Sequence, residues 1–126
     1  MSPEKRTKVL VVEDETSIRN LLSLELKELN CDVVTAEDGI GGLQVLRQQS
    51  FDLIITDVRM PGLDGVGLAE AYRKDHPAQK IVFMTGNAAD EKLAQALDAR
   101  RSYCLKKPFV LNDLAKTITR ALEDRS

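Results

Sequence analysis

The chain has 126 residues, of which 43% are hydrophobic and 30% charged, and this length fits one domain with a core of its own. Its 18 basic and 20 acidic residues give a formal net charge of −2, which excludes the strongly basic character of a nucleic-acid-binding protein. No apolar run approaches the roughly 20 residues of a membrane span and no signal-peptide pattern precedes the first one, so we expect a cytoplasmic domain.

The first part of the chain alternates twice between an apolar run and a helical pattern. Lys8–Val12 is a nearly continuous β-branched run, typical of a strand buried on both faces. A helical stripe of leucines and isoleucine follows, with Thr16 or Ser17 suited to cap it. Asp32–Thr35 predicts a second strand and Asp38–Gln48 a second helix. Two adjacent glycines in that helix weaken it by about 1 kcal/mol each.

The second part of the chain repeats the alternation three times. Phe51–Thr56 predicts the third strand, and Asp64 is placed to cap a helix that runs through Lys74. Lys80–Met84 predicts the fourth strand and Tyr103–Leu105 a short fifth one. The last two helices are indicated by apolar residues at helical spacing, Leu93, Ala96 and Leu97 in one and Leu111, Leu114, Ile118, Ala121 and Leu122 in the other.

Strands that alternate with helices specify an α/β fold, in which right-handed crossovers place helices on both faces of a parallel sheet. We therefore expect a doubly wound sheet of five strands flanked by five helices. No linker or low-complexity tract interrupts the pattern, so residues 1–126 are expected to form a single domain with a core at about residues 7–122. Cys31 and Cys104 lie in apolar stretches and are expected to be buried, reduced thiols.

Polar side chains follow four of the five predicted strands, at the edge of the sheet where open parallel folds bind ligands. Taken singly, each has an ordinary explanation, since acids suit helix amino ends and single polar residues are common in turns. These explanations are independent of one another and account poorly for four such coincidences. The residues are Glu13 and Asp14 after the first strand, Asp57 after the third, Thr85 after the fourth, and Lys106 and Lys107 after the fifth.

Three carboxylates gathered in one crevice must protonate, pair with a cation or bind a metal, because like charges repel. Carboxylate oxygens suit Mg²⁺ (or Mn²⁺), which keeps several waters and takes up a phosphate oxygen. A carboxylate beside such an ion can act as a nucleophile, while an ammonium and a hydroxyl stabilise a transferring phosphoryl group. The pattern therefore indicates a phosphoryl-transfer site.

At these residues the chain resembles the CheY-like receiver domains of two-component signalling, nearly from end to end (about Thr7 to Leu122). The matching stretches are VLVVEDE at 9–15, DLIITDVRMPGLDG at 52–65, FMTG at 83–86 and KPF at 107–109. The resemblance implies a flavodoxin- or CheY-like sheet with the strand order 2-1-3-4-5.

The resemblance also implies a role for each acidic residue. Asp57 corresponds to the residue that accepts phosphate. Asp14 and Asp57 correspond to direct ligands of Mg²⁺ (or Mn²⁺), and Glu13 to an acid that acts mainly through a water. The backbone carbonyl of Arg59 would complete the protein's share of the ligands.

Thr85 corresponds to the switch hydroxyl that turns toward the phosphoryl group. Lys107 corresponds to the lysine that contacts this group, because it directly precedes Pro108 and Phe109. The family usually has a cis peptide bond at this proline, and we expect one here although few X–Pro bonds are cis. Lys106 is the competing candidate, but neighbouring side chains on a strand point to opposite faces.

Two positions depart from the family pattern, and two others correspond to positions that affect the rate of dephosphorylation in the family. Cys104 stands where receivers often have an aromatic residue whose rotamer is coupled to the movement of the switch hydroxyl. Either Tyr103 substitutes for that residue through a register shift, or the hydroxyl is coupled to the surface by another route. Arg100 stands where the family commonly has glycine, and its ordinary explanation is a solvated surface. Arg59 and Asn87 occupy positions that tune the dephosphorylation rate. Without metal, the Arg59 side chain either pairs with an acid of the crevice or lies in solvent.

The function that the resemblance implies is that of a phosphoacceptor switch in a two-component phosphorelay. A sensor histidine kinase or phosphotransfer protein would phosphorylate Asp57 in a Mg²⁺-dependent reaction. The effector would bind to the surface of the fourth helix, fifth strand and fifth helix, without nucleic-acid or membrane contacts by this domain. Such a domain turns over no external substrate, although it assists its own phosphorylation and slow autodephosphorylation.

Three alternatives stay open from the sequence. The first is a degenerate receiver that acts as a plain protein-interaction domain. The second is an aspartate-nucleophile phosphohydrolase, a class that normally carries a second acid where Arg59 stands. The third is a nucleotide- or flavin-binding module of the same fold class, which the acidic loop Glu13–Glu15 disfavours because it repels phosphate.

Overall fold

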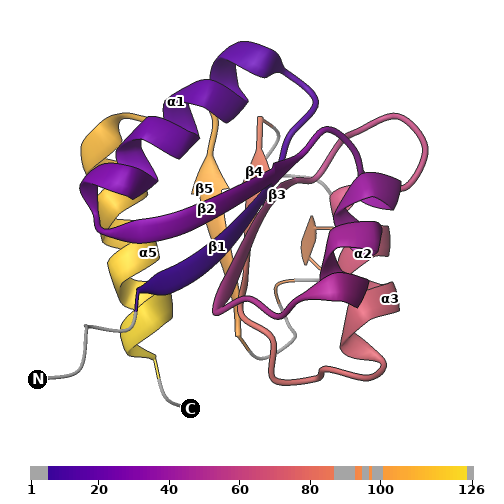
Figure 1. The fold of residues 1–126 in the computed structure, drawn as a ribbon. Helices are drawn as coiled ribbons and strands as arrows, with labels where there is room; N and C mark the ends of the chain where they lie inside the picture. The colour runs from indigo at the N-terminus through magenta and orange to yellow at the C-terminus, as the bar shows by residue number, and fades with distance from the viewer. Residues whose placement is uncertain (1–5, 87–92, 95–96, 98–100, 125–126) are drawn as a thin grey trace, which may run out of the picture.

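The computed structural model describes residues 6–86, 93–94, 97 and 101–124 (Figure 1). Five parallel strands form one sheet in the order β2-β1-β3-β4-β5. This confirms the predicted α/β class and the strand order that the resemblance implied. The strands are β1 (Thr7–Val12), β2 (Cys31–Ala36), β3 (Leu53–Asp57), β4 (Ile81–Thr85) and β5 (Ser102–Lys106).

Helices cover both faces of the sheet, α1 and α5 on one and α2 and α3 on the other (Figure 1). Their bounds are α1 (Thr16–Glu28), α2 (Gly39–Gln48), α3 (Gly65–Arg73) and α5 (Leu111–Glu123). Between β4 and β5, Leu93, Ala94 and Leu97 are helical, and the rest of the predicted fourth helix, with Ala96, lies outside the described residues. The described part of the chain has no helix long and apolar enough to cross a membrane.

The helix starts agree with the sequence in one case and differ in another. Asp64 caps α3 as predicted, because its carboxylate accepts a hydrogen bond of 2.8 Å from the backbone amide three residues on. Asp38 caps α2 in the same way at 2.7 Å. The predicted cap of α1 by Thr16 or Ser17 is wrong. Both residues lie inside the helix, which begins after Glu15 without a side-chain capping bond.

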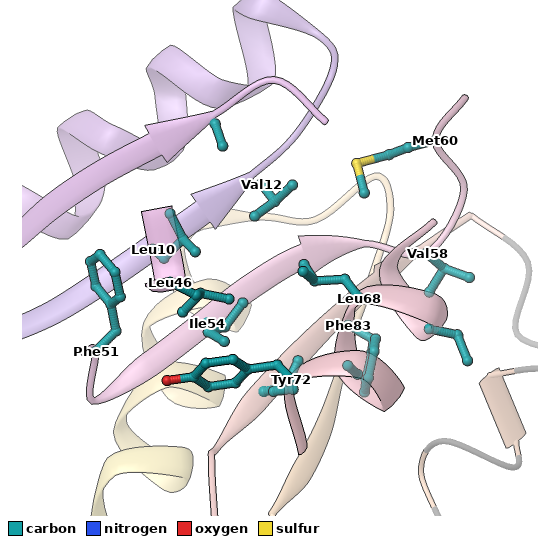
Figure 2. Packing of buried hydrophobic residues seen from close by; sticks show 14 of the residues in the cluster. Leu10, Val12, Leu46, Phe51, Ile54, Val58, Met60, Leu68, Tyr72 and Phe83 are labelled. Carbon is teal, nitrogen blue, oxygen red and sulfur yellow. The ribbon is translucent and has the colours of Figure 1, made fainter. Parts of the chain in front are cut away.

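Each face of the sheet has its own apolar core, because the strands are hydrophobic on both sides. The core against α2 and α3 is built around the labelled residues of Figure 2: Leu10, Val12, Leu46, Phe51, Ile54, Val58, Met60, Leu68, Tyr72 and Phe83. The core against α1 and α5 includes Val9, Val11, Leu22, Leu26, Leu53, Ile55, Val82, Met84, Leu105, Leu114 and Ile118. Strands β1, β3 and β4 are thus packed from both sides, which holds their carboxyl ends in place.

The end of β3 packs directly against the start of α3, and a glycine permits this. A Cβ atom at Gly65 would lie 2.1 Å from the carbonyl oxygen of Asp57, a distance that no side chain can adopt. The Gly65 amide also donates a hydrogen bond of 3.1 Å to the carbonyl of Val58. Asp57, the last residue of β3, is therefore held by the turn that follows it.

The two cysteines differ in exposure, and only one matches the prediction. Cys31 is buried and Cys104 is exposed, and both are free thiols. The expectation that Cys104 would be buried is wrong: side chains alternate along β5, so Tyr103 and Leu105 pack in the core against α1 and α5, while Cys104 points to the other face and is exposed.

Candidate functional site

The carboxyl ends of β1 and β3 bring three acidic side chains together. These strands are neighbours in the sheet, with Val12 opposite Thr56, so the residues that follow β1 lie beside the last residue of β3. Each of Glu13, Asp14 and Asp57 offers a carboxylate oxygen within 4.8 Å of the other two. The three acids that the sequence placed at strand ends therefore form one cluster.

The acids of this cluster differ in their exposure to solvent. Glu13 is fully buried, Asp57 is 8% exposed and Asp14 is exposed. Burial raises the pKa of Glu13 above its usual range, and the nearby Asp14 and Asp57 carboxylates add to this effect. Hydrogen bonds from the Glu15 amide and the Lys107 ammonium act in the opposite direction. The Lys107 ammonium therefore favours the ionised form of Glu13, against the effect of burial.

Lys107 supplies a positive charge from the end of β5. Its Nζ lies 2.8 Å from Oε1 of Glu13 and 2.9 Å from Oδ2 of Asp57. Burial by itself lowers the pKa of this ammonium, but the two carboxylates outweigh burial and raise it. Lys106 is exposed instead. The peptide bond between Lys107 and Pro108 is cis, which confirms the expectation from the family pattern.

Thr85 lies beside the acidic cluster, at the end of β4. This strand pairs with β3, and the Val58 amide donates a hydrogen bond of 2.9 Å to the carbonyl of Met84. Thr85 is 2% exposed, and its carbonyl accepts a hydrogen bond of 2.7 Å from the Lys107 amide. The ends of three adjacent strands thus carry Asp57, Thr85 and Lys107.

The donor set of the cluster fits a divalent cation such as Mg²⁺. Three carboxylate oxygens close together are hard ligands, and the exposed Asp14 gives solvent access for the waters that Mg²⁺ retains. In the structure, the ammonium of Lys107 provides the positive charge between Glu13 and Asp57. Residues 13, 14 and 57 are therefore a site that could hold a metal.

Comparison with known families agrees with this arrangement. Residues 9–119 match the family described as the response regulator receiver domain. The chain belongs to this family. The match includes the acidic cluster, Thr85 and Lys107, so these residues lie within a receiver domain of the kind found in two-component systems.

Curated relatives contain this receiver domain as a small part of longer proteins. The chain is 34% identical over 110 residues to the sensor histidine kinase RcsC of Salmonella typhi, which covers 87% of the chain and 12% of RcsC. It is 36% identical to the sensor protein EvgS of Escherichia coli, with 91% and 9% covered. It is 33% identical to the transcription factor SKN7 of Saccharomyces cerevisiae, with 93% and 19% covered. The chain thus spans less than a fifth of the length of these relatives.

Solved structures show the same fold. The Vibrio cholerae chemotaxis protein CheY4 is 33% identical with a TM-score of 0.87, and the alignment covers 94% of this chain and all of CheY4. NtrX from Brucella abortus is 29% identical with a TM-score of 0.85, and the alignment covers 94% of this chain and 27% of NtrX. A receiver domain thus occurs both as nearly a whole chain and as part of a longer one.

Cys104 is the residue that the family resemblance places at the switch-aromatic position. Cys104 pairs with Phe83 across β4 and β5, whereas Tyr103 packs with the core on the opposite face of the sheet. The Tyr103 hydroxyl donates a hydrogen bond to Oδ2 of Asp124, at the end of α5. Tyr103 and Cys104 thus point to opposite faces of the sheet in this structure.

The other positions that the sequence comparison with the family singled out are Arg59, Asn87 and Arg100. Arg59 is exposed, and its backbone amide approaches Oδ1 of Asp57 at 3.4 Å, a long hydrogen bond. Asn87 and Arg100 lie outside the described residues. Arg101, the residue after Arg100, has a backbone φ of 65°, in the left-handed region that favours glycine. The chain thus turns at Arg101, next to the position where the family pattern has glycine.

Sequence reasoning missed Arg19, which contacts the acidic loop of the receiver domain. Its Nη1 donates a hydrogen bond of 2.7 Å to the carbonyl oxygen of Glu13, and its Nη2 lies 3.6 Å from Oε1 of Glu37. One signal could have pointed to it: a cation in the first turns of a helix is unfavourable next to the positive end of the helix dipole. Such a residue needs a compensating contact, which here is a backbone carbonyl.

Proposed function

We propose that this receiver domain is a phosphorylation switch in which Asp57 accepts a phosphoryl group from a histidine kinase or phosphotransfer protein. The observation that carries the proposal is the placement of the Asp57 carboxylate. It is nearly buried, accepts a hydrogen bond of 2.9 Å from Lys107, and lies in a cluster with two other acids that fits a divalent cation. We take residues 1–126 as one receiver unit with its core at about 7–122.

The side chains of Glu13, Asp14 and Asp57, with the backbone carbonyl of Arg59, would hold Mg²⁺ or Mn²⁺. Such an ion, when bound, offsets the negative charge of the phosphoryl oxygens. Lys107 adds a second positive charge and donates hydrogen bonds to these oxygens. Thr85, at the neighbouring strand end, donates a hydrogen bond from its hydroxyl group to one of the phosphoryl oxygens.

The transfer reaction uses Asp57 as the nucleophile. A carboxylate oxygen attacks the phosphorus of a phosphohistidine, a P–O bond forms, and the P–N bond to the donor imidazole breaks. The imidazole nitrogen keeps the electron pair of that bond and takes up a proton from solvent. Water later hydrolyses the acyl phosphate and restores the carboxylate. The domain thus assists its own phosphorylation and slow dephosphorylation without turnover of an external substrate.

The output is a changed surface for a downstream effector. Phosphorylation adds a charge of about −1.5 to −2 at Asp57, which draws Thr85 and Lys107 toward the phosphoryl group. These residues end β4 and β5, so the change reaches the segment after β4, strand β5 and helix α5. We place the effector surface there and the reaction in the cytoplasm, where kinases have ATP. The relatives named as a sensor histidine kinase and as a transcription factor support partners of these two kinds.

Phosphorylation by a small-molecule donor tests the proposal. The purified chain is incubated with MgCl₂ and phosphoramidate, and its intact mass is measured. We expect a gain of one phosphoryl group in the wild type that EDTA abolishes. Asp57→Asn, which keeps the size of the side chain but removes the nucleophilic carboxylate, is expected to show no gain.

Three outcomes would contradict the proposal. Equal labelling of wild type and Asp57→Asn would place the phosphoryl group elsewhere, and no labelling of the wild type would favour a degenerate receiver that acts as an interaction domain. Release of phosphate from a phosphomonoester at many turnovers per chain would favour the phosphohydrolase alternative instead.

A further inference from the structure

Arg19 connects three parts of the chain around the acidic cluster. It lies in α1, and its side chain is 12% exposed. Its Nη1 donates a hydrogen bond of 2.7 Å to the carbonyl of Glu13, and its Nη2 donates one of 3.3 Å to Oγ1 of Thr16. The same Nη2 lies 3.6 Å from the Glu37 carboxylate, which follows β2. One guanidinium thus joins the segment after β1, helix α1 and the segment after β2.

The Glu13 backbone is fixed from both sides by this arrangement. Its amide donates a hydrogen bond of 3.1 Å to the carbonyl of Ala36, and its carbonyl accepts the hydrogen bond from Arg19. The carbonyl of Glu13 belongs to the peptide unit that joins it to Asp14. Because a peptide unit is planar, fixing its oxygen also fixes the direction in which the chain enters Asp14. Arg19 therefore helps to hold the backbone between two of the three acids in the cluster.

The charge of Arg19 by itself opposes metal binding at the cluster. A guanidinium near the cluster repels a divalent cation, and it lies in the amino-terminal part of α1, where the helix dipole favours negative charge. The Glu37 carboxylate is mostly exposed, so its pairing with Arg19 offers little compensation. What distinguishes Arg19 is its geometry, since a planar fork of donors can bind a backbone carbonyl and a hydroxyl at once.

We propose that Arg19 is a positioning residue, which holds the Glu13–Asp14 peptide so that the carboxylates converge on a divalent cation. This inference rests on the proposed function of Glu13, Asp14 and Asp57 as the metal site. It makes a prediction opposite in sign to simple charge repulsion. Removal of Arg19 strengthens metal binding if its charge dominates and weakens it if its positioning role dominates.

Metal titration of two Arg19 variants tests the proposal. Mg²⁺ and Mn²⁺ affinities are measured by isothermal titration calorimetry for wild type, Arg19→Met and Arg19→Lys. We expect Arg19→Met to bind each ion about five- to tenfold more weakly, and Arg19→Lys, which keeps one donor for the Glu13 carbonyl, to bind with intermediate affinity. Glu37→Gln is the matched control, because it removes the exposed partner of Arg19 but no contact to Glu13, and its affinity is expected to match the wild type.

A second measurement uses the metal-free protein. Amide hydrogen exchange, followed by NMR, should be faster at Asp14 and Glu15 in Arg19→Met than in the wild type. The β3 amides should keep their protection, because only the acidic loop loses a hydrogen bond to Arg19. If Arg19→Met does not fold, metal affinity and amide exchange are measured on Arg19→Lys instead. Metal affinity in these variants equal to or above that of the wild type, or unchanged exchange at Asp14 and Glu15, would overturn the positioning role.

The failure of this inference differs from a failure of the proposed function. If the wild type itself binds neither ion, or if Asp57→Asn binds them as tightly as the wild type, the proposed metal site is rejected. The proposed role of Arg19 is then rejected too, because it depends on that site. If the wild type binds metal at Asp57 and Arg19→Met binds equally well, the metal site stands and only the role of Arg19 is rejected.

Discussion

The Lys107 ammonium lies 2.8 Å from the Glu13 carboxylate, which has no exposed surface. The same ammonium contacts Asp57, so it competes with a divalent cation for both acids. We expect Lys107→Met to bind Mg²⁺ about tenfold more tightly at a pH where Glu13 is ionised, because a competing positive charge is removed. Isothermal titration calorimetry measures this affinity, and Lys106→Met is the matched control that leaves it unchanged.

The same variant should also change how metal binding depends on pH. Burial already raises the pKa of Glu13, and loss of the ammonium that opposes burial raises it further. Protonation of Glu13 removes a ligand charge, so Mg²⁺ affinity falls as the pH drops, and this fall begins at a higher pH in Lys107→Met. A carboxyl-carbon NMR titration of Glu13 in the two proteins checks the shift. The same Glu13 pKa in both would show that the 2.8 Å contact has no electrostatic effect.

The contact between Gly65 and Asp57 predicts a large loss of stability. In Gly65→Ala the new Cβ would lie 2.1 Å from the Asp57 carbonyl, so α3 or the end of β3 must move. We expect a loss of more than about 2 kcal/mol in the free energy of unfolding, measured by urea denaturation.

Gly86 offers a matched control for that prediction. Within the described residues, a Cβ at Gly86 would meet no atom within 4 Å, so Gly86→Ala should change the free energy of unfolding by less than about 1 kcal/mol. Equal losses in Gly65→Ala and Gly86→Ala would mean that the close packing of α3 against β3 is not what makes Gly65 necessary.

The fold could be predicted because its main determinants are local in the sequence. Continuous β-branched runs mark strands that are buried on both faces, and the polar residues that end them mark one edge of the sheet. The strand order does not follow from these patterns, since it depends on which crossovers pass over which face; it came from the resemblance to receiver domains. The sequence gives no sign of why α2 carries a glycine at position 42, where a Cβ would come within 3.0 Å of the Val12 side chain.

The features that could not be predicted depend on contacts between distant segments. The exposure of Cys104 depends on which segments cover its face of β5, which an apolar stretch does not reveal. The contact of Arg19 has a backbone carbonyl as its acceptor, and every residue has one, so no partner in the sequence marks it. Side-chain acceptors such as Asp64 leave a visible spacing, which is why that cap was predicted correctly.

The hydrogen bond from Tyr103 to Asp124 predicts alkaline sensitivity. Burial, with the hydrogen bond and charge of Asp124, raises the pKa of Tyr103 to about 12 from a usual value near 10. The native state therefore keeps this proton between pH 10 and 12 while the unfolded chain loses it, so this contribution to stability is full below pH 10 and is lost as the pH rises toward 12. Ultraviolet difference absorbance of tyrosinate should show a transition near pH 12 that Tyr103→Phe removes.

Tyr103→Phe should also lower the free energy of unfolding near neutral pH by about 1 kcal/mol, since a hydrogen bond to a carboxylate is lost. Tyr72→Phe is the control, because Tyr72 is buried in the other core and its removal leaves the Tyr103 transition in place. A transition near pH 10 in the wild type would contradict the protected position of the Tyr103 hydroxyl.

The two thiols should react in the native protein at very different rates. Cys104 is exposed at the sheet edge, whereas Cys31 is 3% exposed inside the core between β2 and α1. Burial raises the pKa of both thiols, so even Cys104 should react with iodoacetamide more slowly than a free cysteine. Intact mass should show one label under native conditions and a second only in denaturant. In Cys104→Ser the native label should disappear; if it persists at the same rate, Cys31 is accessible and the packing of that core differs from the one described.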